Sequence, residues 1–220
     1  MKALTKNSLL APILAWAILS PGWTHATIIT KAPDLGPLWY SLTVPDGSSM
    51  YANSFVAPHD STVAGAGTWL NTEILDPATE MRFQIWGSVG NDPSSGPDYL
   101  NVRASTAAIT GMNGPLTLYS ASTPGSLTLT AGNTYWFVAT IVVSPGLGSF
   151  QVGGHTQNSV YPDNGTFWFS SEPEGQTFDG TSHTPEMAFQ VELVAVPEPS
   201  TWLAGLSVSL AALAFFLKNV

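Results

Sequence analysis

Hydrophobic and polar side chains alternate along much of the stretch between residues 27 and 196, and this period of two constrains the fold more than any other feature. The alternation is clear in Leu38–Val44, Met81–Ile85 and Met187–Leu193. No window in the same stretch keeps the period of about 3.6 residues that an amphipathic helix requires. A period of two places one set of side chains in a core and the other in solvent, so we expect an all-β domain.

The segment Tyr135–Ile141 differs from the other expected strands because both of its alternating sets are largely apolar. Such a strand is covered on both faces, which predicts a central position in its sheet. Shorter strands are expected at Tyr51–Val56, Tyr99–Arg103, Leu116–Tyr119, Ser126–Thr130, Ser149–Val152 and Thr166–Phe169. Turn signals such as Pro45-Asp46-Gly47 separate them. Many short strands over about 170 residues predict a two-sheet sandwich, jelly-roll-like in its connections.

Charged residues make up only 10% of the chain and are unevenly divided, with six Lys and Arg against fifteen Asp and Glu. Between residues 27 and 195 only Lys31, Arg82 and Arg103 are cationic, against fourteen acids, so this domain carries a net charge of −11. Nucleic-acid binding needs clustered cations that displace counterions from phosphates, so we expect no nucleic-acid partner. The chain has no cysteine, which excludes disulfides and thiolate chemistry.

The first 26 residues are typical of a signal peptide. Lys2 and Lys6 supply a basic start, and Leu9–Leu19 supplies an apolar segment of eleven residues. That segment is too short to span a bilayer, which takes about 20 residues. Small residues at Thr24 and Ala26 suit signal peptidase. We predict a signal helix that is removed by cleavage after Ala26, followed by an exported domain over residues 27–195.

The last 25 residues form a second expected targeting segment, over residues 196–220. Two prolines enclose one acid in the run Val196, Pro197, Glu198, Pro199, Ser200 and Thr201. Neither proline can donate a helix hydrogen bond, so a helix can begin only after Pro199. The apolar run Leu203–Leu217 follows, and a helix of that length approaches the bilayer core of about 30 Å. Trp202 and Lys218 suit its two interfaces, which predicts a single transmembrane helix.

This tail resembles the PEP-CTERM sorting signal of exported proteins in Gram-negative bacteria. In that family a Pro-Glu-Pro motif, a short hydrophobic helix and a basic cluster end the chain. The resemblance implies that the helix holds the precursor in the inner membrane until an exosortase-type transpeptidase processes it near the motif Val196–Thr201. The basic end departs from the family pattern, because Lys218 stands alone before Asn219 and Val220.

The middle of the chain carries a second resemblance. Ser54-Phe55-Val56, Met81–Ile85 and the stretch from Leu127 to Val138 are similar to exported bacterial β-domains that occur with alternative surface anchors, called choice-of-anchor domains. That resemblance supports the sandwich and implies no established activity.

Motifs of catalysis are missing from the sequence: it contains no Gly-x-Ser-x-Gly elbow, His-Glu-x-x-His pair or phosphate loop. His59, His155 and His183 are far apart in sequence, and we expect no metal site from them. Oxygen-rich turns at Asp76–Glu80 and Asp163-Asn164-Gly165 leave structural calcium open beside ordinary Asx turns. We therefore expect no enzyme and no cofactor.

Aromatic residues give the best indication of a ligand. In the strand expected at Thr166–Phe169, Phe167 and Phe169 share one face and Trp168 takes the other, and Tyr161 precedes them closely. Trp168 and Tyr161 are therefore candidates for stacking on a sugar ring, with burial in the core as the alternative. Our leading prediction is a structural or adhesive protein of the cell surface or extracellular matrix. The alternative is a carbohydrate-binding module that acts on exopolysaccharide.

Overall fold

The computed structural model describes residues 26–33, 35–44, 50–74, 76–88, 90, 96–143, 148–155, 167–170, 180–182 and 186–196. Residues Ala26–Ala195 form one compact unit, and Met1–His25 and Val196–Val220 are outside it. The expected signal helix and transmembrane helix lie outside the described residues. In the part of the chain that is described, no helix has the length and apolarity needed to cross a bilayer.

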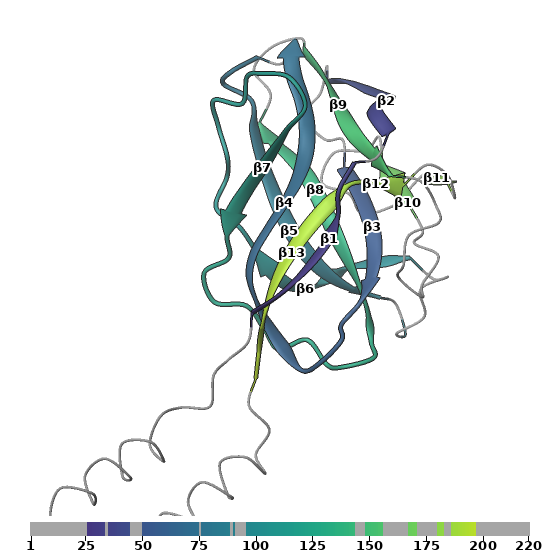
Figure 1. Cartoon of the computed structure of the whole chain (residues 1–220), viewed down its shortest axis with the longest axis vertical. Coiled ribbons are helices and arrows are strands. Elements are labelled where there is room, and N and C mark those ends of the chain that lie inside the picture. Colours follow the sequence, from purple (N-terminus) through teal and green to yellow (C-terminus); the bar gives the residue numbers. More distant parts are fainter. Residues whose placement is uncertain are drawn as a thin grey trace, which may run out of the picture. The chain divides into compact units, whose positions relative to one another are not determined.

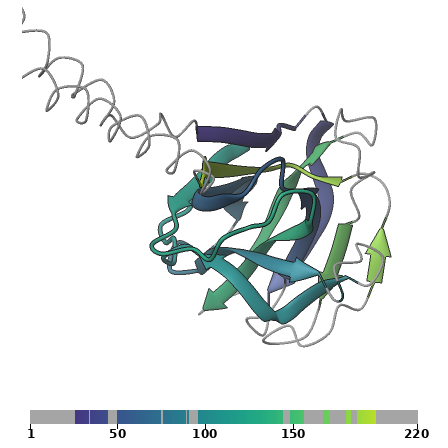
Figure 2. The ribbon, with the colours of Figure 1, turned by 90° about the horizontal axis from the view of Figure 1, so that it is seen from below.

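All the described strands belong to two antiparallel sheets (Figure 1). Sheet A contains, in spatial order, β1 (Ala26–Lys31), β13 (Phe189–Ala195), β4 (Ser61–Ile74), β9 (Gly148–His155) and β12 (Glu186–Met187), with β2 (Leu35–Val44) paired to β9 and β7 (Thr117–Ser122) paired to β4. Sheet B contains, in spatial order, β11 (Gly180–Ser182), β10 (Phe167–Ser170), β3 (Met50–Val56), β8 (Thr134–Val143), β5 (Glu80–Ser88) and β6 (Pro97–Ser105). Figure 2 gives the same domain from below.

The inner faces of the two sheets meet in one aromatic core. Phe137 of β8 stacks on Phe189 of β13, with ring centroids 5.3 Å apart. Phe55 of β3 also contacts Phe189, at 6.1 Å. Because these pairs join residues of different sheets, the sheets pack face to face. The expectation of an all-β, sandwich-like domain with two sheets is confirmed.

The prediction that Tyr135–Ile141 forms a central strand is confirmed, because β3 and β5 pair with the two edges of β8. Its inward residues, including Phe137, are buried in the main core. Its outward residues Trp136 and Val138 are buried in a second apolar cluster with Met50, Ala52 and Trp86. The indole Nε1 of Trp136 donates to Ser88 Oγ at 2.8 Å, so this buried polar group is satisfied. Both faces of β8 are therefore covered.

One predicted strand is absent, and the strands β1, β4 and β11 were not predicted. The segment Ser126–Thr130 is not a strand, because only Leu129 forms a bridge, with Ser61. The hydroxyl of Ser126 instead accepts a hydrogen bond from Val63 N at 2.7 Å, which ties the segment to β4 through a side chain. The segment is therefore held against β4 by this side-chain hydrogen bond and by a single bridge, and not by strand pairing. The fourteen-residue strand β4 was not expected at all.

Candidate functional site

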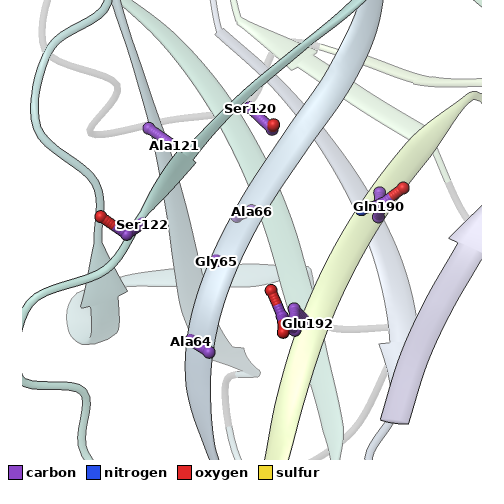
Figure 3. Close-up of a pocket in the computed structure, with 8 residues that line it drawn as sticks. All are labelled: Ala64, Gly65, Ala66, Ser120, Ala121, Ser122, Gln190 and Glu192. Atoms are coloured by element: carbon purple, nitrogen blue, oxygen red, sulfur yellow. The ribbon is translucent and has the colours of Figure 1, made fainter. Parts of the chain in front are cut away.

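A hollow of about 230 Å³ lies on the outer face of sheet A, over β7, β4 and β13 (Figure 3). It is lined by Ala64, Gly65 and Ala66 of β4, by Ser120, Ala121 and Ser122 of β7, and by Gln190 and Glu192 of β13. Gln190 and Glu192 alternate with the buried residues Phe189, Val191 and Leu193, which places the first two on the face turned away from the core.

Gly65 of β4 lines this hollow, and Gly67 lies two residues further along the same strand. The strand register places Gly65 between Ser122 and Glu192, and Gly67 between Ser120 and Gln190. A Cβ atom at Gly67 would lie 2.5 Å from Tyr119 O and 2.6 Å from Ser120 Cβ, which is closer than real Cβ contacts. The close approach of β7 to β4 therefore requires a glycine at position 67.

Gly65 is less constrained than Gly67. The nearest atoms to a Cβ built there are Ala121 O at 3.3 Å and Glu192 Oε2 at 3.6 Å. Figure 3 shows the carboxylate of Glu192 reaching from β13 toward Gly65. Because Gly65 has no side chain, the space beside the Glu192 carboxylate stays open.

The side chains around the hollow suit hydrogen bonding to a neutral, hydroxyl-rich molecule. The Ser120 and Ser122 hydroxyls and the Gln190 amide each donate and accept, whereas the ionised Glu192 carboxylate accepts only. Glu192 is the one carboxylate among the residues that line it. Glycoside hydrolysis takes two acids separated by about 5–10 Å, so the residues of this hollow do not supply that pair.

Of the two residues predicted to contact sugar, the structure describes only the backbone of Trp168. Trp168 lies in β10, where its backbone is opposite Ala52 of β3 on one side and Thr181 of β11 on the other. Its side chain and the whole of Tyr161 lie outside what the structure describes. Stacking on these two residues remains a prediction.

Other aromatic side chains are placed, and most are buried. Trp86 and Trp136 lie in the second apolar cluster, and the Trp86 Nε1 donates to Gln84 Oε1 at 3.2 Å. Trp69 is half-buried on β4. Tyr99 of β6, at 40% exposure, is the exposed aromatic residue among those whose side chains are described. The described aromatic rings therefore do not form a flat exposed platform.

The expected signal-cleavage residue and the first residue of the sorting motif lie at the two ends of the folded unit. Ala26, the expected cleavage residue, is the exposed first residue of β1. Val196 directly follows β13 and is exposed. The rest of the sorting motif, Pro197, Glu198, Pro199, Ser200 and Thr201, lies outside the described residues.

The described residues contain no group of three or more His, Asp and Glu that could hold a metal ion. The ring of His59 bonds through Nε2 to the hydroxyl of Thr27 at 2.9 Å, which ties the start of β1 to the turn after β3. At the Asp76–Glu80 turn, the Asp76 carboxylate accepts from Ala78 N at 2.8 Å. That contact is the Asx-turn alternative to a calcium ligand. The turn Asp163-Asn164-Gly165 and His183 lie outside the described residues.

Sequence reasoning missed all eight residues that line the hollow. The available signal was the run Ala64-Gly65-Ala66-Gly67, because glycine within a strand often marks the close approach of another backbone. The residues of β7 and β13 become part of the site only through their pairing with β4. That pairing joins segments more than fifty residues apart in sequence.

A comparison with protein-family models finds no match, and a comparison with curated proteins finds none either. Among solved structures, the chain is similar to one described as the structure of infectious bursal disease virus, Gx strain. The two are 10% identical, with a TM-score of 0.32, and the match covers 80% of this chain and 41% of the other. This chain therefore matches less than half the length of that protein.

Proposed function

We propose that this chain is an exported, non-enzymatic structural or adhesive protein of the cell surface or extracellular matrix, sorted by its C-terminal motif. The supporting observation is the position of the folded unit. The strand β1 begins at Ala26 and β13 ends at Ala195, so the unit occupies the span between the two expected targeting segments. Ala26 pairs with Val194. The first and last strands of the unit are therefore neighbours in sheet A.

The processing that we propose has two steps. Signal peptidase removes the N-terminal segment after Ala26, which leaves Thr27 as the first residue of the exported protein. The C-terminal helix then holds the protein in the inner membrane until an exosortase-type transpeptidase acts near Val196–Thr201. This part of the proposal is supported by the residues of the two segments themselves.

We also propose that the sandwich is a jelly roll, with extra strands inserted before the last one. Eight strands count in chain order: β1, β3, β4, β5, β6, β7, β8 and β13. In sheet A the first, eighth, third and sixth of them are neighbours, and in sheet B the second, seventh, fourth and fifth. This order is that of two nested Greek keys. Of the remaining strands, β2 lies between the first two strands of the motif, and β9 to β12 are an insertion between the last two.

The described surface supports a structural role better than catalysis. The hollow on sheet A offers hydroxyls, one amide and one carboxylate. Those groups can contact a neutral polymer but include no activated nucleophile or pair of facing acids. A non-enzymatic role in a matrix or at a surface needs only stable folding and such contacts.

Carbohydrate binding is the second candidate, and the same hollow favours it. The hydroxyl and amide groups that line the hollow can replace the water that solvates a sugar, and its lining residues include no Lys or Arg, which suits a neutral polysaccharide. Trp168 and Tyr161 add a separate stacking candidate. In this case the partner is exopolysaccharide outside the cell.

The test of sorting replaces Pro197, Glu198 and Pro199 with Ala in the full chain, in a Gram-negative host that contains an exosortase. We expect the precursor to remain unprocessed in the inner membrane, because the transpeptidase has lost its recognition motif. Pro124→Ala, in an exposed turn of the sandwich, is the matched control and should be sorted normally. Membrane fractionation and N-terminal sequencing provide the measurements. Processing equal to that of the wild type would rule out motif-directed sorting, and recovery of Met1 would rule out signal cleavage.

A further inference from the structure

Among the described residues, β7 is a sheet edge that lacks the usual devices against pairing with another chain. A free strand edge presents unpaired N–H and C=O groups, and natural proteins protect such edges with charges, prolines, bulges or very short strands. The six residues of β7 contain no charge and no proline. Their register with β4 runs without a shift from Gly65 opposite Ser122 to Leu70 opposite Thr117. No described strand pairs with the other edge of β7.

The other edges of both sheets carry such devices. In β1 the inward residue Lys31 is only 1% exposed, and its Nζ lies 5.7 Å from the centroid of the Phe189 ring. A charged residue that points inward opposes extension of the sheet. The strand β2 contains Pro37, and its register with β9 shifts twice. The strands β11 and β12 have only three and two residues.

The edge strand β6 is protected by a bulge. Its register with β5 passes from Val102 opposite Trp86 directly to Asp98 opposite Gly87, so the three residues Tyr99, Leu100 and Asn101 have no partner in the ladder. The side chain of Asn101 occupies the space beside Gly87, where a Cβ would be 2.3 Å from Asn101 Nδ2. Leu100, at 79% exposure, projects from this bulge. A neighbouring chain therefore cannot continue the ladder along β6.

We propose that β7 is the site at which a second copy of this chain pairs, antiparallel and about a two-fold axis perpendicular to sheet A. We place the axis at Ser120, so that Ser120 is opposite the partner's Ser120, and Leu118 is opposite the partner's Ser122. Residues directly opposite in such a pair lie on the same face, so the two sheets become one continuous sheet. Thr117, Ser120 and Ser122 are exposed in the single chain.

At this edge two copies can meet with little charge repulsion. Two domains of −11 repel each other over most of their surfaces, but β7 itself is neutral. Opposed serines can exchange a hydrogen bond, and no like charges meet across the two-fold axis. A six-residue edge buries less area than the roughly 1,200–2,000 Å² of a stable interface, so the association is weak in solution. Crowding at a surface or in a matrix raises the local concentration and makes such pairing effective.

The biological use of this pairing rests on the proposed structural role. The pairing itself does not depend on whether the protein is sorted by its C-terminal motif. The test is sedimentation equilibrium of the exported protein, purified from its host, at concentrations rising to about 1 mM. We expect a reversible monomer–dimer equilibrium within that range. A protein that remains monomeric at the highest concentration would overturn the proposal, including the case in which β7 pairs only with another protein.

The variant Ser120→Lys places two ammonium groups opposite each other at the two-fold axis. We expect it to raise the dimer dissociation constant at least about tenfold, since like charges directly opposite are destabilising. Thr128→Lys adds the same charge in an exposed loop and should dimerise as the wild type does. Equal dimerisation of both variants would contradict the proposal. If Ser120→Lys lowers the unfolding midpoint, because β7 approaches β4 most closely near Ser120, Ser122→Lys is used instead. That variant places an ammonium group opposite the apolar Leu118 of the second copy, and we expect it to weaken the dimer as well. Failed sorting changes the location of the protein but not its sedimentation, so the two proposals fail separately.

Discussion

Phe137 contacts aromatic side chains of both sheets and is fully buried. Its ring centroid lies 5.7 Å from that of Phe83 in sheet B and 5.3 Å from that of Phe189 in sheet A. Phe137→Ala removes both contacts and leaves a cavity between the sheets, so we expect a loss of about 3–5 kcal/mol in the free energy of unfolding. Val142→Ala, on the same strand at 38% exposure, is the control and should cost far less. A loss below about 1 kcal/mol for Phe137→Ala in denaturant unfolding would show that the ring is not in the core.

At the scale of single elements, the sequence predicted strands well where apolar side chains alternate and poorly where packing replaces side chains with glycine. The strand β8 was predicted because Tyr135–Ile141 is apolar on both faces. The strand β4 was missed, although it is the longest, for two reasons: Gly65 and Gly67 leave two positions of its outward set without side chains, and a bulge at Ala64 shifts the alternation, so that Val63 and Ala66 both face the core. Of the two, Gly67 is needed by the neighbouring strand β7 rather than by β4 itself. A contact between segments distant in the sequence leaves no periodic signal in either one.

The same close approach gives a prediction about the pairing of β4 and β7. Gly67→Ala forces a methyl group against Tyr119 O and Ser120 Cβ, so one strand must shift. Overpacking of this kind costs about 1–3 kcal/mol of unfolding free energy. Gly65→Ala is the matched comparison, with its nearest atom at 3.3 Å, and we expect it to cost less. Thermal or denaturant unfolding measures both. If Gly65→Ala costs as much as Gly67→Ala, the loss reflects glycine in a strand generally and not the approach of β7.

For the whole molecule, the fold class was predictable and the candidate site was not. Alternation and turns predict two sheets, and packing of Phe55, Phe137 and Phe189 joins them into one core. The hollow on sheet A depends instead on which strands become neighbours. Its polar residues Ser120, Gln190 and Glu192 are ordinary surface residues in the sequence and come together only through the register with β4. From the sequence alone, only Trp168 and Tyr161 could be proposed as contacts to a sugar, because aromatic rings are recognisable as stacking residues. Serine, glutamine and glutamate occur all over protein surfaces and do not mark a site by their type.

The charge of the whole domain determines which partners it can attract. With three cations against fourteen acids between residues 27 and 195, the domain has no patch from which polyanion binding could release counterions. Contact with a neutral glycan, by stacking or by the hydroxyl and amide groups of the hollow, depends little on salt. Contact driven by charge is instead screened beyond about 10 Å at 0.1 M ionic strength. We therefore expect no binding to heparin or DNA, and expect that any glycan binding is unchanged between low and high salt. Binding of the exported protein to a glycan array at two salt concentrations measures this.

If a neutral glycan binds, Trp168→Ala and Gln190→Ala separate the stacking candidate from the hollow, and Tyr99→Ala serves as the exposed-aromatic control. Tight heparin binding that weakens with salt would contradict the charge argument, whereas the absence of all glycan binding would favour the structural role over the carbohydrate-binding one.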